Sequence, residues 1–228
     1  MAEEALKVKA TKKAQNDLRT STEKIDKNLS KIAALKRSDL VPTDSRIFPM
    51  SFAPIIVREN NEKVIKLARY HCKPANKTAT IDAKYNGLYN ARSDNLGNAF
   101  WKDLFGHKHG FFVVNSFYEN VSSVDYGPSP TKDHKNLVVQ FTAKNKAELK
   151  IACLYDYWES NSDDGFYSFA ALTGDPNREV LEAGHDRLII ALADENLESW
   201  LNPAADLLSM KRILDNPERH QFLHAIVK

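Results

Sequence analysis

Residues 54–67, PIIVRENNEKVIKL, decide the class of fold that this chain adopts. Two apolar runs, Pro54-Ile-Ile-Val57 and Val64-Ile-Lys-Leu67, flank the pair Asn60-Asn61. Short apolar runs on either side of an asparagine turn predict a β-hairpin. From Ile47 onward the chain continues as short apolar runs broken by turn residues. Further strands are expected over Gly110–Asn115, Leu137–Thr142, Leu149–Tyr155, Phe166–Leu172 and Leu188–Ala193.

Helices are expected at three places among these strands. They are Asn98–Phe105, Asp194–Leu201 with Asp194 as its N-cap, and the C-terminal stretch from Ala204. Strands and helices do not alternate regularly, as they would in βαβ units. The sequence therefore predicts an α+β fold with a largely antiparallel sheet and peripheral helices.

The first forty residues differ in character from the rest of the chain. Ala5–Lys36 contains no Gly and no Pro, and its apolar residues form one helical stripe at Leu18, Ile25, Leu29 and Ile32. We expect one long helix, ended by Pro42, and a division into domains 1–40 and 41–228. So thin a stripe buries little by itself. The helix therefore needs a partner: a second helix, another subunit through self-association, or a segment outside this sequence.

The charge of the chain is concentrated at its start. Residues 1–38 hold ten Lys or Arg and five Asp or Glu, although the net charge of the whole chain is only +2. A basic leader on a near-neutral body is typical of a nucleic-acid-binding arm. A solvated, lysine-rich helix face is the alternative interpretation.

Composition and motifs argue against several classes of protein. The longest apolar run, Leu188–Ala193, has six residues, against about 20 needed to cross a bilayer, so no membrane partner is expected. Two cysteines are too few for a disulfide framework and no secretory signal opens the chain, which predicts a cytoplasmic protein. Phosphate-binding loops and dinucleotide fingerprints are lacking, so no cofactor is expected.

Histidine and cysteine offer two weak alternatives. His107-Lys-His109 could place two imidazoles on one side of a strand, but third and fourth zinc ligands are missing, so no metal site is expected. Cys72, between His71 and Lys73, could be an activated nucleophile of an unrelated hydrolase, although a structural role is the favoured interpretation. Cys153 lies in an apolar run and is expected to be an inert core thiol.

Three polar segments lie next to apolar runs. They are Tyr89-Asn90-Ala91-Arg92-Ser93-Asp94, which looks like a loop, Asn115-Ser-Phe-Tyr-Glu119-Asn120, which closes a strand, and Gly184-His185-Asp186-Arg187, which precedes one. Polar groups at the ends of core strands are often binding or catalytic groups, because the sheet holds them rigidly. Taken singly, each segment could equally be a turn, a surface pair or a helix cap.

In this order and spacing, the segments resemble the SOS-response-associated peptidase (SRAP) family. That family's pattern runs N-A-R-x-E, G-F-Y-E-W, G-L-W-x-x-W, H-D-R-M-P and a closing W-L-x-P. The counterparts here are Asn90–Asp94, Ser116–Asn120, Cys153–Trp158, His185–Ile189 and Trp200–Pro203. The resemblance spans residues 46–203 and looks closest to a divergent branch with a long helical insertion before the hairpin. It implies a barrel-like sheet.

The resemblance also implies a function. Members of the family bind single-stranded DNA and react with the aldehyde of an abasic site through an N-terminal cysteine. The amine of that cysteine forms a Schiff base and its thiol closes a thiazolidine, which crosslinks protein and DNA. Self-removal of preceding residues exposes the cysteine, hence the peptidase label. Such a protein would associate with the nucleoid when bound to damaged DNA.

By position, the resemblance assigns three catalytic residues. Asn90 would orient the amine and sugar, Glu119 would move protons at the Schiff base, and His185 would act as general acid and base. The predicted DNA-binding residues are Arg92, Arg187, Trp101, Arg69 and Lys73, with Arg92 and Arg187 on phosphates and Trp101 stacked on a base.

The chain departs from the family at four places. Asp94 replaces Glu, Asn120 replaces Trp, and Leu188-Ile189 replaces Met-Pro. The sequence also begins Met1-Ala2, without the N-terminal cysteine. We expect that a Met-Cys segment is missing from this sequence and that the chain is inactive in crosslinking without it. The alternative is a non-catalytic member that only binds single-stranded DNA.

Overall fold

The computed structural model describes residues 11–39, 41–128, 130–159, 165–202 and 206–227. The chain packs as two compact units, Met1–Arg46 and Ile47–Lys228. The first contains helix α2 (Lys12–Lys36) and the short 3-10 helix η1 (Pro42–Ser45). Thr11 caps α2 by accepting a hydrogen bond of 3.2 Å from the backbone of Ala14.

The predicted long helix is confirmed over residues 12–36, and residues 5–10 lie outside the described ranges. The helix ends at Lys36, six residues before Pro42, so the expectation that Pro42 ends it was wrong. Along α2 the apolar side chains of Ile25, Leu29 and Ile32 are exposed. Within the described part of the chain, no helix is both long enough and apolar enough to span a bilayer.

The predicted hairpin is confirmed and begins the second unit. Strands β1 (Phe52–Glu59) and β2 (Glu62–Tyr70) pair antiparallel, with Glu59 opposite Glu62. Asn60 and Asn61 connect them with φ of 48° and 67°. Positive φ at both central residues is the geometry of the type I′ turn, which asparagine tolerates better than other non-glycine residues.

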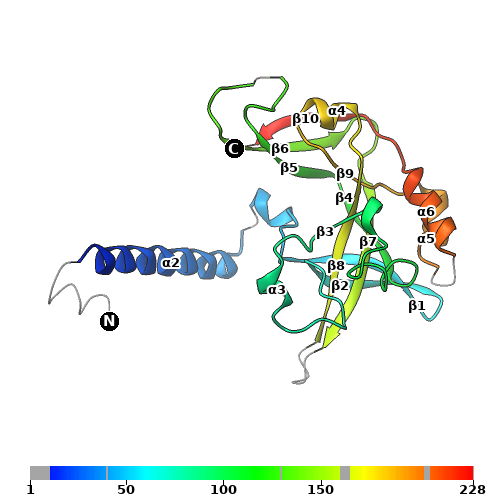
Figure 1. Cartoon of the computed structure of the whole chain (residues 1–228), viewed down its shortest axis with the longest axis horizontal. Helices are drawn as coiled ribbons and strands as arrows, with labels where there is room; N and C mark the ends of the chain where they lie inside the picture. The colour runs from blue at the N-terminus through cyan, green and yellow to red at the C-terminus, as the bar shows by residue number, and fades with distance from the viewer. Residues whose placement is uncertain (1–10, 40, 129, 160–164, 203–205, 228) are drawn as a thin grey trace. The chain divides into compact units, whose positions relative to one another are not determined.

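Five strands close into a barrel. β1 and β2 continue through β4 (His109–Val114) to β7 (Leu149–Glu159) and β8 (Gly165–Gly174), and a parallel pairing of β8 with β2 completes the ring. The short strands β3 (Asn90–Arg92) and β9 (Leu188–Ile189) add to β8 outside the ring (Figure 1). Most pairings are antiparallel, those of β8 with β2 and β3 being parallel, so the predicted α+β, barrel-like fold with a largely antiparallel sheet is confirmed.

A second sheet of three strands lies at one end of the barrel, beside helix α4 (Arg178–Glu182) (Figure 1). It consists of β5 (Ser116–Ser122), β6 (Asn136–Ala143) and β10 (Phe222–Val227) in the order β10-β6-β5. Phe117, Phe141 and Phe222 pack into the same apolar core as the inward side chains of the barrel. This shared core fixes β5, and with it Glu119, relative to the barrel.

The outer faces of β7 and β8 carry a second core. Ala152 and Leu154 of β7 and Leu172 of β8 pack against the elements that follow β9. These elements are η3 (Asp194–Asn196), α5 (Leu197–Trp200) and α6 (Leu207–Asp215). The remaining short helices are α3 (Ile81–Lys84) and η2 (Ser93–Asn95).

Several local predictions were wrong. Residues 98–105 form successive turns instead of a helix, because backbone hydrogen bonds there alternate between three- and four-residue spacing. The stretch from Ala204 is helical only over 207–215 and ends in strand β10, with 204–205 outside the described residues. Asn90–Arg92 is a strand, not a loop, since it pairs with β8. Leu188–Ala193 is reduced to the two residues of β9.

Candidate functional site

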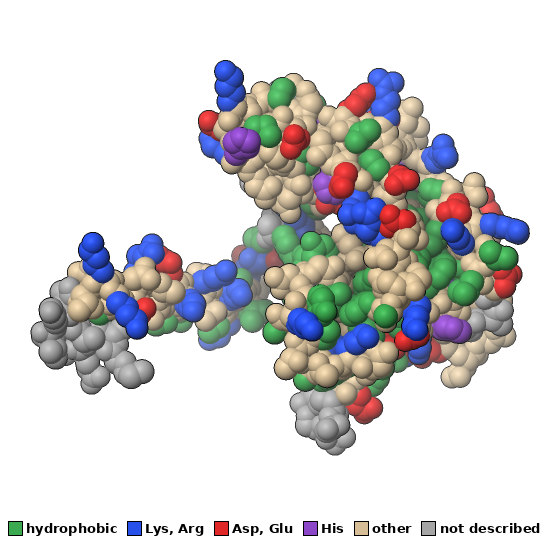
Figure 2. All heavy atoms as spheres, in the orientation of Figure 1, with side chains coloured by type: hydrophobic (Ala, Val, Ile, Leu, Met, Phe, Trp, Pro, Cys, Tyr) green, Lys and Arg blue, Asp and Glu red, His purple; other side chains and the backbone are tan. Residues whose placement is uncertain are grey.

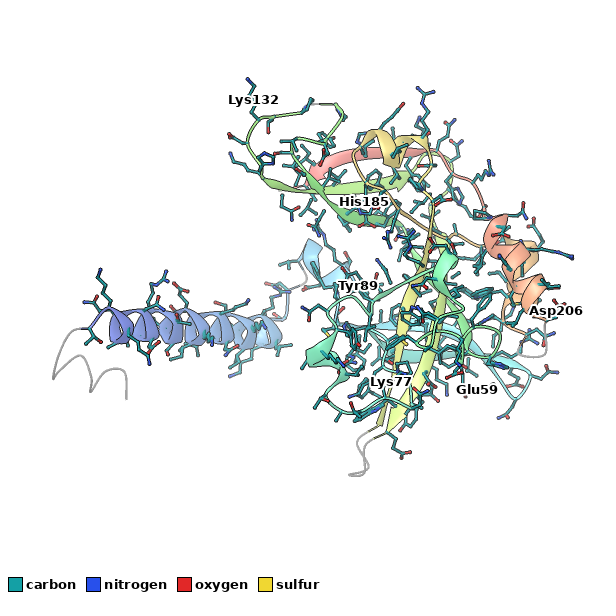
Figure 3. The ribbon with its side chains drawn as sticks, viewed as in Figure 1. Glu59, Lys77, Tyr89, Lys132, His185 and Asp206 are labelled. Carbon is teal, nitrogen blue, oxygen red and sulfur yellow. The ribbon has the colours of Figure 1, made fainter. Side chains whose placement is uncertain are left out.

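Glu119 and His185 form the centre of the candidate site. The Oε2 atom of Glu119, on β5, lies 3.2 Å from the Nε2 atom of His185, and the two side chains are only 18% and 19% exposed. His185 follows Gly184, whose φ of +91° ends the turn after α4. A Cβ atom there would lie 2.3 Å from the carbonyl oxygen of Asp125, so the turn requires glycine. Figure 3 shows His185 beneath the small sheet, on the side toward the barrel.

The hydrogen bonds of His185 fix where its protons lie. Its Nδ1 atom is 2.9 Å from the backbone carbonyl oxygen of Arg187. A carbonyl oxygen can only accept, so Nδ1 carries a hydrogen and donates it. Nε2 and the Glu119 carboxylate would then face each other with lone pairs unless one further proton lay between them. The pair therefore holds a proton that either partner can carry, which is the property of a general acid–base couple.

The surroundings favour the protonated carboxyl. Burial raises the pKa of Glu119 above its ordinary value. The positive charges of His185 and Arg187 lower this pKa, while the negative charge of Asp186 raises it, and the net shift is upward. A carboxyl with a raised pKa keeps its proton to a higher pH than an exposed glutamate does, which suits it to act as an acid.

Asn90, the third predicted catalytic residue, is held by Tyr70. The hydroxyl of Tyr70, at the end of β2, donates a hydrogen bond of 2.9 Å to Oδ1 of Asn90 on β3. Burial raises the pKa of Tyr70, and the negative charge of Glu119 raises it further. The structure thus pairs Glu119 of β5 with His185 of the loop after α4, and Asn90 of β3 with Tyr70 of β2.

A cavity of about 360 Å³ lies next to this group. Arg92, Arg187 and Lys211 line it with positive charge, and Leu96, Phe105 and Leu214 supply apolar walls. Four carboxylates also reach it, from Asp94, Asp175, Asp186 and Asp215. Figure 2 shows basic and acidic side chains lying side by side on the face where the small sheet meets the barrel.

The three basic side chains that line this cavity differ in their ion-pair partners. Arg92 donates two hydrogen bonds to the carboxylate of Asp94, at 2.8 and 2.6 Å. Arg187 lies 3.8 Å from Asp186. Lys211 forms no ion pair with any residue that the structure describes. The cavity wall also contains the hydroxyl of Thr173, which is buried and has no hydrogen-bond partner among those same residues.

Trp101 does not fit its predicted role. Its side chain is 6% exposed and lies in the second core, where its ring meets that of Phe100 edge-on at 4.5 Å. A ring covered on its faces by core side chains cannot stack on a DNA base without local unfolding, so this prediction is corrected.

Arg69 and Lys73 do not fit their predicted roles either. Arg69 donates two hydrogen bonds of 2.9 Å to Asp82. The Lys73 ammonium lies 3.7 Å from the same carboxylate and 3.4 Å from the centre of the Trp158 ring. Both side chains are buried, Lys73 at 3% exposed. These cations hold the segment of Asp82 against the barrel instead of facing a phosphate.

Burial also bears on Cys72, Cys153 and His109, the residues of the two weak alternatives. Cys72 and Cys153 are both fully buried, and burial raises the pKa of each thiol, which argues against an activated nucleophile. His109 stacks on Trp200 and donates from Nδ1 to its carbonyl oxygen at 3.1 Å. Burial lowers the pKa of His109 to about 4. It is a neutral core residue.

Sequence reasoning missed Tyr70, Thr173 and Lys211. Nothing local distinguishes Tyr70 from the other aromatic residues of a strand, because its hydrogen bond joins residues twenty positions apart. Thr173 ends an apolar strand and could have been suspected from that position. Lys211 could not, since a lysine on an amphipathic helix is usually solvated.

The fold and site define a class of protein: a small closed barrel with an attached sheet, whose acid–base pair lies beside a charged cavity. Two solved structures share this fold. A protein from Bordetella bronchiseptica superposes with a TM-score of 0.66 at 21% identity, covering 84% of this chain and 90% of that one. A protein from Bacteroides thetaiotaomicron gives 0.63 at 17% identity, covering 80% and 76%.

The sequence profile described as SOS response associated peptidase (SRAP) matches residues 11–227, so the chain belongs to the SRAP family. Curated relatives include the abasic site processing protein YobE of Bacillus subtilis, 30% identical over 65% of this chain and 63% of its own length. The abasic site processing protein YoqW of the same organism is 30% identical over 51% of this chain and 48% of its own length. The matches thus span about half to two thirds of these relatives.

Proposed function

We propose that this chain is an abasic-site processing protein that binds single-stranded DNA through the unit Ile47–Lys228. The observation that carries the proposal is the contact of 3.2 Å between Oε2 of Glu119 and Nε2 of His185. Both residues, and Asn90, stand at the positions that the family motifs mark as catalytic. The names of the relatives, which are abasic site processing proteins, support the same function.

The proposed substrate is the ring-opened sugar of an abasic site. An amine adds to its aldehyde carbon while the carbonyl oxygen takes a proton, and the resulting carbinolamine loses water to give a Schiff base. Each of these steps moves a proton at oxygen or nitrogen, which the Glu119–His185 couple can give and take back. Arg92 and Arg187 would hold the flanking phosphates, because guanidinium groups match phosphate geometry.

The proposal extends to a covalent crosslink between the protein and DNA. The amine then belongs to an N-terminal cysteine, exposed by removal of the residues before it, whose thiol adds to the Schiff-base carbon and closes a thiazolidine. This sequence begins Met1-Ala2, and its cysteines, Cys72 and Cys153, are buried. Because a Schiff base without a neighbouring thiol hydrolyses, we expect no heat-stable crosslink from the chain that begins Met1-Ala2.

Binding measurements test the proposal. Fluorescence anisotropy would compare two labelled single strands that differ only in one position, an abasic site or a thymidine. We expect the chain to prefer the abasic strand and His185→Ala to abolish the preference. His134→Ala, which alters an exposed histidine on the loop before β6, is the matched control and should keep it. A heat-stable adduct mapped to Cys72 or to a lysine would contradict the proposed chemistry.

The cavity supports a second candidate function, a non-catalytic binder of single-stranded DNA. Arg92, Arg187 and Lys211 line the cavity, and their positive charge attracts the phosphates of a strand whether or not it carries an abasic site. This alternative predicts equal, salt-sensitive affinity for both strands. A preference for the abasic strand that depends on His185 would rule it out.

A further inference from the structure

Tyr70 has a contact that the proposed chemistry does not yet explain. Its ring is held on three sides: it stacks on Phe169 with centres 5.1 Å apart, meets Tyr89 edge-on at 5.7 Å, and lies 6.4 Å from Phe112. Aromatic packing of this kind leaves the phenol little freedom to move. Its hydroxyl is thereby fixed at one point, 2.9 Å from Oδ1 of Asn90.

The fixed hydroxyl decides which end of the Asn90 carboxamide faces a ligand. A carboxamide has an accepting oxygen and a donating nitrogen, which differ little in shape and exchange places by a half-turn. Burial and the charge of Glu119 raise the pKa of Tyr70, so the phenol stays protonated and remains a donor near neutral pH. Since this donor is satisfied by Oδ1, Nδ2 is the group left for a ligand.

We propose that Tyr70 is a positioning residue, whose hydroxyl holds the Asn90 carboxamide with Nδ2 as a donor to an oxygen of the abasic sugar. The inference rests on the proposed function and extends it to a residue outside the motif segments. It also specifies the chemistry of recognition. A fixed donor such as Nδ2 suits a sugar hydroxyl or aldehyde oxygen, since each can accept a hydrogen bond from it.

The test uses Tyr70→Phe, which removes one oxygen and keeps the ring that packs on Phe169. The measured quantity is the preference ratio, the affinity for the abasic strand divided by that for the thymidine strand. We expect the ratio to fall about three- to tenfold, as for loss of one hydrogen bond to a positioned group. Affinity for the thymidine strand and its salt dependence should not change. Tyr85→Phe, at an exposed tyrosine, is the matched control.

A double-mutant cycle separates positioning from general loss of structure. If Tyr70 acts through Asn90, Asn90→Ala removes the same preference, and adding Tyr70→Phe to Asn90→Ala costs nothing more. Additive losses in the double variant, or an unchanged ratio in Tyr70→Phe, would overturn the inference. An equal affinity of the unmodified chain for both strands would instead overturn the proposed function, so the two failures are distinguishable.

Discussion

Replacing Glu119 by Gln should make the folded chain more stable at neutral and alkaline pH. Burial holds the pKa of Glu119 above its ordinary value of 4.5, so the folded state prefers the neutral carboxyl. Glu119 therefore stabilises the folded state fully at pH values below the pKa that it has in the unfolded chain. This stabilisation is lost as the pH rises through the higher pKa that it has in the folded chain. Gln is neutral throughout, and its amide can donate to Nε2 of His185, so the contact between the two side chains is kept.

The size of the effect follows from the burial of the pair. Each unit by which the folded pKa exceeds the unfolded one corresponds to about 1.4 kcal/mol of stability lost above it. Glu119 is 18% exposed, so water screens part of this cost, and single stabilising substitutions commonly gain about 0.5–2 kcal/mol. We expect a gain of about 1 kcal/mol at pH 8, which raises the melting temperature of a chain of this length by about 2–4 °C.

Thermal unfolding followed by circular dichroism at pH 8 and at pH 4.5 measures this gain. The gain of Glu119→Gln should be present at pH 8 and largely absent at pH 4.5, where the wild-type carboxyl is also protonated when folded. Glu62→Gln, at an exposed glutamate, removes the same formal charge and should show no such pH dependence. A variant that is no more stable at pH 8, or equally stabilised at both pH values, would refute the reasoning.

Three further predictions concern other parts of the molecule. Asp82→Ala should lower the free energy of unfolding by about 3 kcal/mol, measured by urea titration, because it leaves buried cations unpaired. Asp94→Ala breaks the exposed pair with Arg92 and should lower it by less than about 1 kcal/mol. Similar losses in the two variants would contradict this contrast. Lys211→Ala should weaken binding of single-stranded DNA and reduce the slope of log affinity against log salt by about 0.7, and an unchanged slope in anisotropy titrations would show that Lys211 contacts no phosphate. Cys72 should react with iodoacetamide slowly in the native chain and quickly in urea, as mass spectrometry can follow, because burial both covers the thiol and raises its pKa.

Strands with strong local signals could be predicted from the sequence. The hairpin around Asn60-Asn61 was predicted because two apolar runs meet at residues that tolerate positive φ. The cores of β4, β6, β7 and β8 were predicted from their apolar runs. Strand β10 was missed because its pairing with β6, about 80 residues earlier in the chain, overrides the local preference.

Candidate site residues divide in the same way. Asn90, Glu119 and His185 were chosen from short motifs. The structure brings Glu119 and His185 into contact, and Asn90 accepts a hydrogen bond from Tyr70. Trp101 and Lys73 were also chosen by residue type, yet both are buried. Aromatic and basic side chains can bind DNA, but they can also pack together in a protein interior, with the cation over the aromatic ring. Residue type alone therefore cannot tell a DNA-binding residue from a buried one.

The sequence by itself determined the apolar runs that become strands, the turn at Asn60-Asn61, the long N-terminal helix and the identity of the polar motif residues. Only the tertiary structure decided that β2 pairs with β8 to close the barrel, through Ala68–Tyr70 and Tyr167–Phe169. The same closure places Tyr70 against Phe169 and beside Asn90. Local preference acts over a few residues, whereas strand closure and the sharing of a proton between Glu119 and His185 depend on how distant segments pack around a common core.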